Sequence, residues 1–143
     1  MAAGLYPVFF CTFASMAQHN ELGRMGEEAA ARYLMFHDYS IRDLNWHCGH
    51  WELDIVAERY GELVVVEVKS RSSERYGTPV EAVDEEKKRH LSRAADVYMR
   101  YYKLDMPVRF DIIAVTGVPP ACRIEHIRNA FRPLLWDEHL QKP

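Results

Sequence analysis

The sequence lacks the excess of basic residues that is typical of proteins that coat nucleic acids. Its 18 lysines and arginines are outnumbered by 21 aspartates and glutamates, which gives a net charge of −3. A protein that binds polyanions along its whole surface would usually be basic. Any contact with nucleic acid must therefore come from a local basic patch, as in an enzyme that binds its substrate transiently.

Cysteine is also scarce. The three cysteines, Cys11, Cys48 and Cys122, are far apart in the sequence and form no CxxC pair. This spacing argues against a disulfide framework or a zinc ribbon, and favours a reducing cytoplasmic location. The segment HCGH at residues 47–50 has no second Cys/His cluster near it. Because a structural zinc site needs four ligands, we interpret the segment as an ordinary loop.

No segment is typical of a membrane span or a secretory signal. The apolar run at residues 5–14 is interrupted by Pro7, and no basic residue precedes Arg24. A spanning helix needs about 20 apolar residues, and a signal peptide begins with positive charge. We therefore expect no membrane contact. We favour Met16 as the biological start, with residues 1–15 derived from an upstream start codon; a weak signal peptide is the alternative.

Repeats, low-complexity tracts and linkers are absent as well, and 143 residues suit one compact domain. We assign residues 1–19 to an N-terminal extension, 20–133 to the domain and 134–143 to a C-terminal tail. Hydrophobic periodicity predicts an α/β domain in which helices flank a mixed central sheet. The expected order is α-β-β-β-α-β-β: helix 20–37, strands 39–46, 52–59 and 62–69, helix 78–102 with a break near Asp84, and strands 108–115 and 123–127.

Local signals predict where each of the two helices begins. Asn20 is the expected N-cap of the first helix. Thr78 and Glu81 have the spacing of a capping box, with Pro79 at the first helical position of the second.

The second and third strands are predicted to form a hairpin that aligns four charged residues. If Tyr60 and Gly61 form a two-residue turn, the numbers of cross-strand partners sum to 121. Asp54 is then opposite Glu67, and Glu52 is opposite Lys69. Since side chains alternate between faces along a strand, these four would project from one face.

Two carboxylates in directly opposed positions repel each other. That repulsion disappears if a divalent cation lies between Asp54 and Glu67, and Mg²⁺ typically binds through one or two carboxylates, water and substrate phosphate. Lys69 would bring an ammonium group to the same place, where it could stabilise charge on phosphate oxygens. The alternative is a solvated strand face with a Glu52–Lys69 ion pair. The residues alone leave both interpretations open.

Several segments resemble, in order, the motifs of the YraN-like family of small bacterial proteins. They are GRMGEEAA at 23–30, WELDIV at 51–56, VEVKSR at 66–71, VDEEK at 83–87 and RFD at 109–111. This family is similar in fold to the PD-(D/E)xK nucleases, and most similar to archaeal Holliday-junction resolvases. The resemblance extends over residues 20–133 and implies a restriction-endonuclease-like core.

The resemblance also implies roles for individual residues. Asp54 and Glu67 match the metal-binding carboxylates, with the Val68 carbonyl as a further ligand, and Lys69 matches the catalytic lysine. Glu27 matches an additional acidic residue that resolvase-like members bring to the metal, although its spacing alone predicts an ordinary exposed glutamate. Trp51 replaces a glycine that the family usually has there, which would narrow the approach to the site or provide a stacking surface.

Basic residues near these motifs are candidates for contact with DNA phosphates. The alternative is a solvated helix face, because acidic residues flank the group on the second helix. Asp111 matches a family motif, and we expect it to cap or to hydrogen-bond locally. The candidate nucleic-acid-binding residues are Arg24, Arg71, Lys87, Lys88 and Arg93.

The sequence therefore predicts a cytoplasmic nucleic-acid-binding protein, an Mg²⁺- or Mn²⁺-dependent endonuclease that acts on branched or otherwise structured DNA. Since resolvases act as two-fold dimers on two-fold substrates, a homodimer is expected. One alternative is a non-catalytic nucleic-acid-binding or protein-interaction module that retains the fold. Another is a metal-dependent hydrolase of small phosphate compounds.

Overall fold

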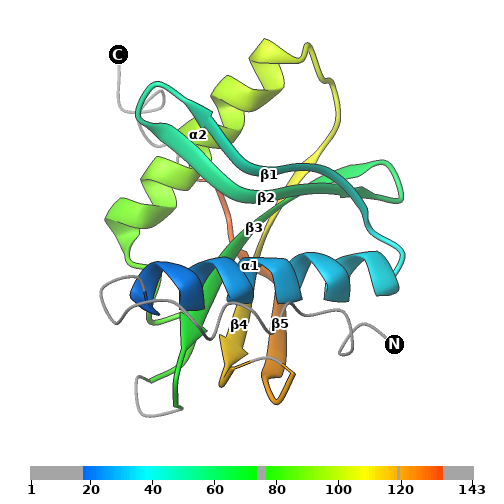
Figure 1. Ribbon diagram of the computed structural model, residues 1–143. Coiled ribbons are helices and arrows are strands. Elements are labelled where there is room, and N and C mark those ends of the chain that lie inside the picture. Colours follow the sequence, from blue (N-terminus) through cyan, green and yellow to red (C-terminus); the bar gives the residue numbers. More distant parts are fainter. Residues whose placement is uncertain (1–17, 74–76, 119, 134–143) are drawn as a thin grey trace.

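A computed structural model (Figure 1) describes residues 18–73, 77–118 and 120–133. Its elements follow the predicted order α-β-β-β-α-β-β. The predicted N-terminal extension, apart from residues 18 and 19, and the C-terminal tail lie outside the described residues. The elements are α1 (Gln18–Phe36), β1 (Ser40–Cys48), β2 (Trp51–Arg59), β3 (Glu62–Arg71), α2 (Glu85–Tyr101), β4 (Val108–Thr116) and β5 (Arg123–Phe131).

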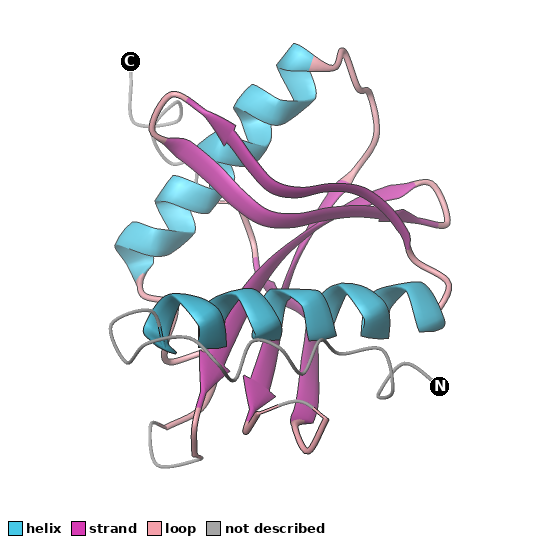
Figure 2. Ribbon diagram, viewed as in Figure 1, coloured by secondary structure: helices cyan, strands magenta, loops and turns pink. Residues whose placement is uncertain are grey.

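The five strands form one mixed sheet in the order β1-β2-β3-β4-β5. Only β3 and β4 are parallel, and α2 provides the crossover that a parallel pair requires. The other neighbouring strands are antiparallel. In the view of Figure 2, α1 crosses in front of the sheet and α2 lies behind β1 and β2. The predicted α/β fold with a mixed central sheet is confirmed.

Two apolar clusters, one on each face of the sheet, form the core. Leu63 and Val65 of β3 pack with α2, whereas Val64 and Val66 pack with α1. All four are buried, so β3 is covered on both faces. Each side chain of this kind contributes about 1.5–3 kcal/mol through burial, so β3 anchors both layers.

The β2–β3 hairpin has the predicted register. Pairs run from Arg59–Glu62 to Ile55–Val66, and their numbers sum to 121 as predicted. Tyr60 and Gly61 both have positive φ, 52° and 76°, as a two-residue type I′ turn requires. Because the turn fixes the register, Asp54 and Glu67 are the next pair beyond the end of the ladder.

The predicted helix between residues 78 and 84 is wrong. The capping bonds form, since Thr78 N–H donates to Glu81 Oε1 at 2.9 Å and Glu81 N–H donates to Thr78 Oγ1 at 3.3 Å, but they close only a turn. Asp84 then caps α2 by accepting a bond from the Lys87 amide at 2.8 Å. Because Asp84 has extended backbone angles, the predicted break is the true start of the helix. In α1 the helix begins before Asn20, so the predicted N-cap is also wrong.

Gly26 sets the separation of α1 from β3. A Cβ atom there would clash with Ser70 Oγ and lie 2.9 Å from Ser70 Cβ, whereas one at Gly23 would meet nothing within 4 Å. We therefore expect Gly26→Ala to lower the free energy of unfolding by about 1–3 kcal/mol. Gly23→Ala should raise it by about 0.5–1 kcal/mol, because glycine disfavours a helix interior. Urea denaturation of both variants provides the comparison, and equal effects would contradict the close contact.

Candidate active site

The candidate site begins where the β2–β3 ladder ends. By the alternation of an antiparallel ladder, the next hydrogen-bonded pair after Ile55–Val66 would be Leu53 and Val68. The Val68 amide instead donates to Asp54 Oδ2 at 2.9 Å. The Asp54 carboxylate thus replaces a backbone acceptor and is held beside β3.

The alternation of side chains breaks at this point. Leu53 packs in the cluster on the α2 face and Ile55 in the cluster on the α1 face, although they are two residues apart. On the neighbouring strand, Asn45 lies between the partners of these two residues and has a positive φ of 50°. The prediction that all four charged residues project from one regular face is therefore wrong. The regular alternation ends where β2 bends at Asp54 and β1 bends at Asn45.

Glu67 is buried between two lysines. Its side chain is 6% exposed, and its Oε2 lies 3.5 Å from Lys69 Nζ and 3.5 Å from Lys87 Nζ. Lys69 comes from the same strand and Lys87 from the first turn of α2. Since charges are costly to bury unless they are paired, the two ammonium groups allow Glu67 to remain in this position.

Asp54 lies half-buried in the same environment. Burial, followed by the neighbouring Glu67 carboxylate, raises the pKa of Asp54 from 3.8 to about 7, against the lowering effect of the Val68 hydrogen bond. The structure therefore brings the two predicted carboxylates together. Their mutual repulsion is the property that a bound cation would relieve.

Glu27 approaches the pair from α1. Burial, and then the charge of Asp54, raise the pKa of Glu27 to about 7, while a hydrogen bond from Asn45 acts in the opposite direction. Glu27 also lines a small hollow together with Arg24 and Asn45. The helix thus adds a third carboxylate at the edge of the site, and the close packing of Gly26 on β3 helps to place it.

The oxygen atoms at the site fit a hydrated Mg²⁺ ion. The Val68 amide donates to Asp54 Oδ2, and in a regular strand the carbonyl of the same residue would point to the same side. Across the described ranges, no three His, Cys, Asp or Glu side chains converge as a ready-made metal cluster. Mg²⁺ does not need one, since it keeps several waters and binds through one or two carboxylates. Asp54, Glu67 and the Val68 carbonyl are the atoms that would hold it.

The alternative Glu52–Lys69 ion pair does not form. Glu52 Oε2 lies 3.1 Å from His47 Nε2, and Lys69 contacts Glu67 instead. The bend at Asp54 separates the start of β2 from β3, which is why the extrapolated pairing fails.

Of the basic candidates on α2, only Lys87 reaches the carboxylates. Successive residues of a helix point about 100° apart, and Lys88 turns away to pair with Glu85 at 3.1 Å. Its Nζ also lies 5.9 Å from the centre of the Phe131 ring. Arg93 is partly exposed further along the same helix.

The other two basic candidates flank the site. Arg24 is exposed on α1 and pairs with Glu21 at 2.8 Å. It shares its hollow with Glu27. Arg71, at the end of β3, donates a hydrogen bond to the Gly77 carbonyl.

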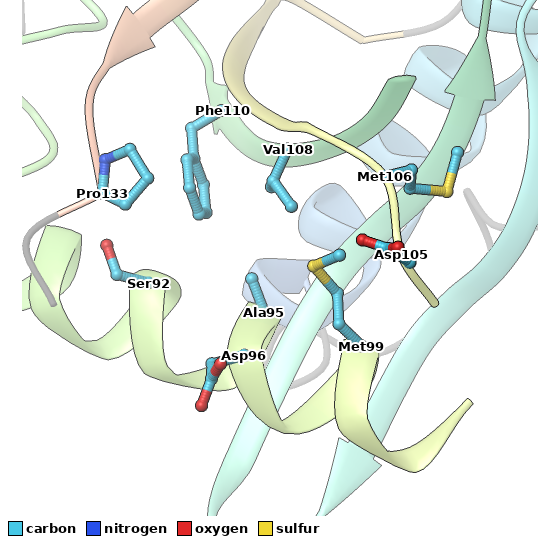
Figure 3. Close-up of a pocket in the computed structure, with 9 residues that line it drawn as sticks. All are labelled: Ser92, Ala95, Asp96, Met99, Asp105, Met106, Val108, Phe110 and Pro133. Atoms are coloured by element: carbon cyan, nitrogen blue, oxygen red, sulfur yellow. The ribbon is translucent and has the colours of Figure 1, made fainter. Parts of the chain in front are cut away.

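A larger cavity of about 490 Å³ lies elsewhere, between α2 and the start of β4. Figure 3 shows Met99, Val108 and Phe110 projecting into it. None of its lining residues belongs to the carboxylate site. Its walls are mainly apolar and carry no grouped catalytic side chains, so the smaller polar site is the better candidate for chemistry.

The five-stranded mixed sheet with flanking helices matches a restriction-endonuclease-like core. The chain belongs to the uncharacterised protein family UPF0102, the YraN-like family, whose family model matches residues 26–115. That range contains all of the carboxylate and lysine residues of the site. None of the helices in the described part of the chain is both long and apolar enough to cross a membrane.

Relatives in this family are similar over most of their length. A UPF0102 protein of Phocaeicola vulgatus is 52% identical over 121 residues, which is 85% of this chain and 100% of the relative. A UPF0102 protein of Bacteroides thetaiotaomicron is 54% identical over 121 residues, which is also 85% of this chain and 100% of the relative. One of Porphyromonas gingivalis is 52% identical over 122 residues, 84% of this chain and 90% of the relative.

Proposed function

We propose that this protein is an Mg²⁺- or Mn²⁺-dependent endonuclease that hydrolyses phosphodiester bonds in branched or otherwise structured DNA. The observation that carries the proposal is the pairing of the half-buried Asp54 with the buried Glu67, with Lys69 Nζ at 3.5 Å from Glu67. A chain selected only for stability would not place two carboxylates together at the end of a ladder.

Each residue of the site has a distinct task in this proposal. Asp54, Glu67 and the Val68 carbonyl hold the metal ion. The ion, when bound, neutralises charge on the phosphate and lowers the pKa of the attacking water. Lys69 places a positive charge where negative charge grows on the phosphate oxygens, and Glu27 adds a carboxylate at the outer edge.

The test is a cleavage assay on single-stranded, duplex, flap and four-way-junction DNAs with Mg²⁺ or Mn²⁺. We expect Asp54→Ala and Lys69→Ala each to reduce the rate at least about a hundredfold, the usual effect of removing one group that stabilises a transition state. Arg100→Ala is the matched control, because Arg100 is an exposed cation at the far end of α2, paired with Asp96 at 3.0 Å. Cleavage that needs no metal, or that survives both site substitutions, would contradict the proposal.

A second candidate is a non-catalytic nucleic-acid-binding or protein-interaction module. It is favoured by the two lysines that already neutralise Glu67, and by the net charge of −3. DNA binding that persists in EDTA, without cleavage and without any change on Asp54→Ala, would support this module over the enzyme.

The proposal includes a cytoplasmic location and a homodimer. A two-fold assembly presents two equivalent sites to a two-fold DNA junction. Light scattering of the free protein and of its complex with a four-way junction would measure the number of subunits.

A further inference from the structure

Three aromatic rings gather at the start of β2, beside the carboxylate site. The ring centres of Trp51 and His50 are 4.2 Å apart, and those of Trp51 and His90 are 5.0 Å apart. His90 belongs to α2, so the cluster joins the helix to the β1–β2 turn. Trp51 is partly buried and packs against the apolar cluster on the α2 face.

A groove adjoins this cluster at His90, and Trp51 borders it through its ring contact with His90. Its volume is about 370 Å³, and its walls include His90, Glu52 and Lys87. Lys87 also lies 3.5 Å from Glu67, so one side chain links the groove to this buried carboxylate. Glu52 follows Trp51 directly in the sequence and is two residues from Asp54.

The charges of the groove indicate what it can hold. Glu52, Asp84 and Glu86 contribute three carboxylates against the single ammonium of Lys87. A phosphate backbone would be repelled from these walls. A neutral planar group would not be repelled, and the carboxylates can accept hydrogen bonds from amino groups at the edge of such a group. Burial, then the charge of Lys87, lowers the pKa of His90, so its ring is neutral and suited to stacking at neutral pH.

We propose that Trp51 and His90 form a stacking wall for one unpaired DNA base, whose neighbouring phosphate then reaches Asp54, Glu67 and Lys69. This proposal rests on the proposed nuclease function and names its substrate class. A base within a duplex is already stacked and paired, whereas a base at a bulge, flap or junction is free to enter the groove. The stacking wall therefore selects structured DNA through an exposed base rather than through sequence.

The experiment uses three DNA duplexes that differ at one position: a bulged adenine, a bulged abasic nucleotide and full pairing. We expect the protein to cleave the bulged adenine substrate about tenfold faster than the abasic one, an effect typical of one base stacked on an aromatic side chain. Trp51→Leu, which keeps an apolar side chain but removes the ring, should lose this preference. Trp51→Phe should retain much of it.

The abasic substrate provides an internal control, because Trp51→Leu should not slow its cleavage further. Tyr60→Leu is the matched variant: Tyr60 is 86% exposed at the tip of the hairpin, and its replacement should leave the preference intact. DNA cleavage with equal rates on adenine and abasic bulges, or a preference that survives Trp51→Leu, would overturn the stacking wall and leave the nuclease standing. Failure to cleave or bind any of the three DNAs would overturn both.

Discussion

Replacing Asp111 by Asn is expected to lower the free energy of unfolding by about 3–5 kcal/mol, the usual cost of removing one partner of a buried ion pair. The Asp111 side chain is 0% exposed. It accepts bonds from Arg109 Nε and Nη2, both at 2.8 Å, and from the Asn129 amide at 2.9 Å. Its contact with His126 Nε2 is 2.7 Å. Both oxygen atoms of this carboxylate have two polar partners each, so its negative charge is fully compensated.

The network holds separate parts of the fold together. Arg109 also donates to the Tyr39 hydroxyl at 2.7 Å, which joins β4 to the segment before β1. The Asn129 amide bond joins β4 to β5 where their register shifts between Phe110 and Ile112. Asparagine at position 111 would leave the largely buried Arg109 cation without its main partner.

Urea denaturation of Asp111→Asn measures this loss. Asp105→Asn is the matched control, because Asp105 is exposed in the loop before β4 and should change stability by less than about 0.5 kcal/mol. Arg109→Met in the Asp111→Asn background should recover part of the loss, since the unpaired Arg109 cation is then removed and its other partner, Glu62, is partly exposed to water. An Asp111→Asn variant as stable as the control would contradict the structural role.

The same network predicts a dependence on acid pH. Burial tends to raise the pKa of Asp111, but hydrogen bonds from His126, Arg109 and the Asn129 amide outweigh it and hold the pKa below 3.8. The contribution of Asp111 is therefore complete above about pH 4 and is lost as the pH falls through the folded value. Asp111→Asn should remove this part of the acid sensitivity.

The parts of the fold that the sequence predicted are those with local causes. Tyr60 and Gly61 set the hairpin register through their own backbone preferences, which is why the predicted pairing of β2 with β3 is confirmed. Longer-range pairing was missed. β5 was predicted to end at Ile127 but continues to Phe131, because the Phe131 ring stacks on Phe110 of β4 at 4.9 Å.

The candidate site shows the same difference between features with local causes and features that depend on distant parts of the chain. The adjacency of Asp54 and Glu67 followed from the hairpin, but the bend that reorients Asp54 depends on Asn45 in another strand. Lys87 was assigned to DNA phosphate, and its contact with Glu67 depends on how α2 docks against the sheet. The Asp84 cap was the available signal, because it places Lys87 in the first turn.

Neutralising Asp54 should stabilise the metal-free protein at alkaline pH. Because the folded pKa of about 7 lies above the ordinary 3.8, the wild type loses stability as the pH rises from about 4 to about 7. Asp54→Asn removes that loss and keeps an oxygen to accept the Val68 amide bond. We expect the variant to match the wild type near pH 4 and to exceed it by about 4 kcal/mol at pH 8, since each of the roughly three pKa units is worth about 1.4 kcal/mol.

Thermal melts with and without Mg²⁺ then separate a metal site from a structural one. A ligand that binds only the folded state raises Tm, so Mg²⁺ should raise the Tm of the wild type but not that of Asp54→Asn. Glu52→Gln, a neutralisation of an exposed carboxylate on the same strand, should reproduce neither effect. If Asp54→Asn were instead less stable than the wild type at pH 8, the carboxylate would be serving the folded state as a paired charge. Stabilisation at pH 8 that Mg²⁺ abolishes would mean that Asp54 is kept at the cost of stability, as expected of a residue retained to hold a cation.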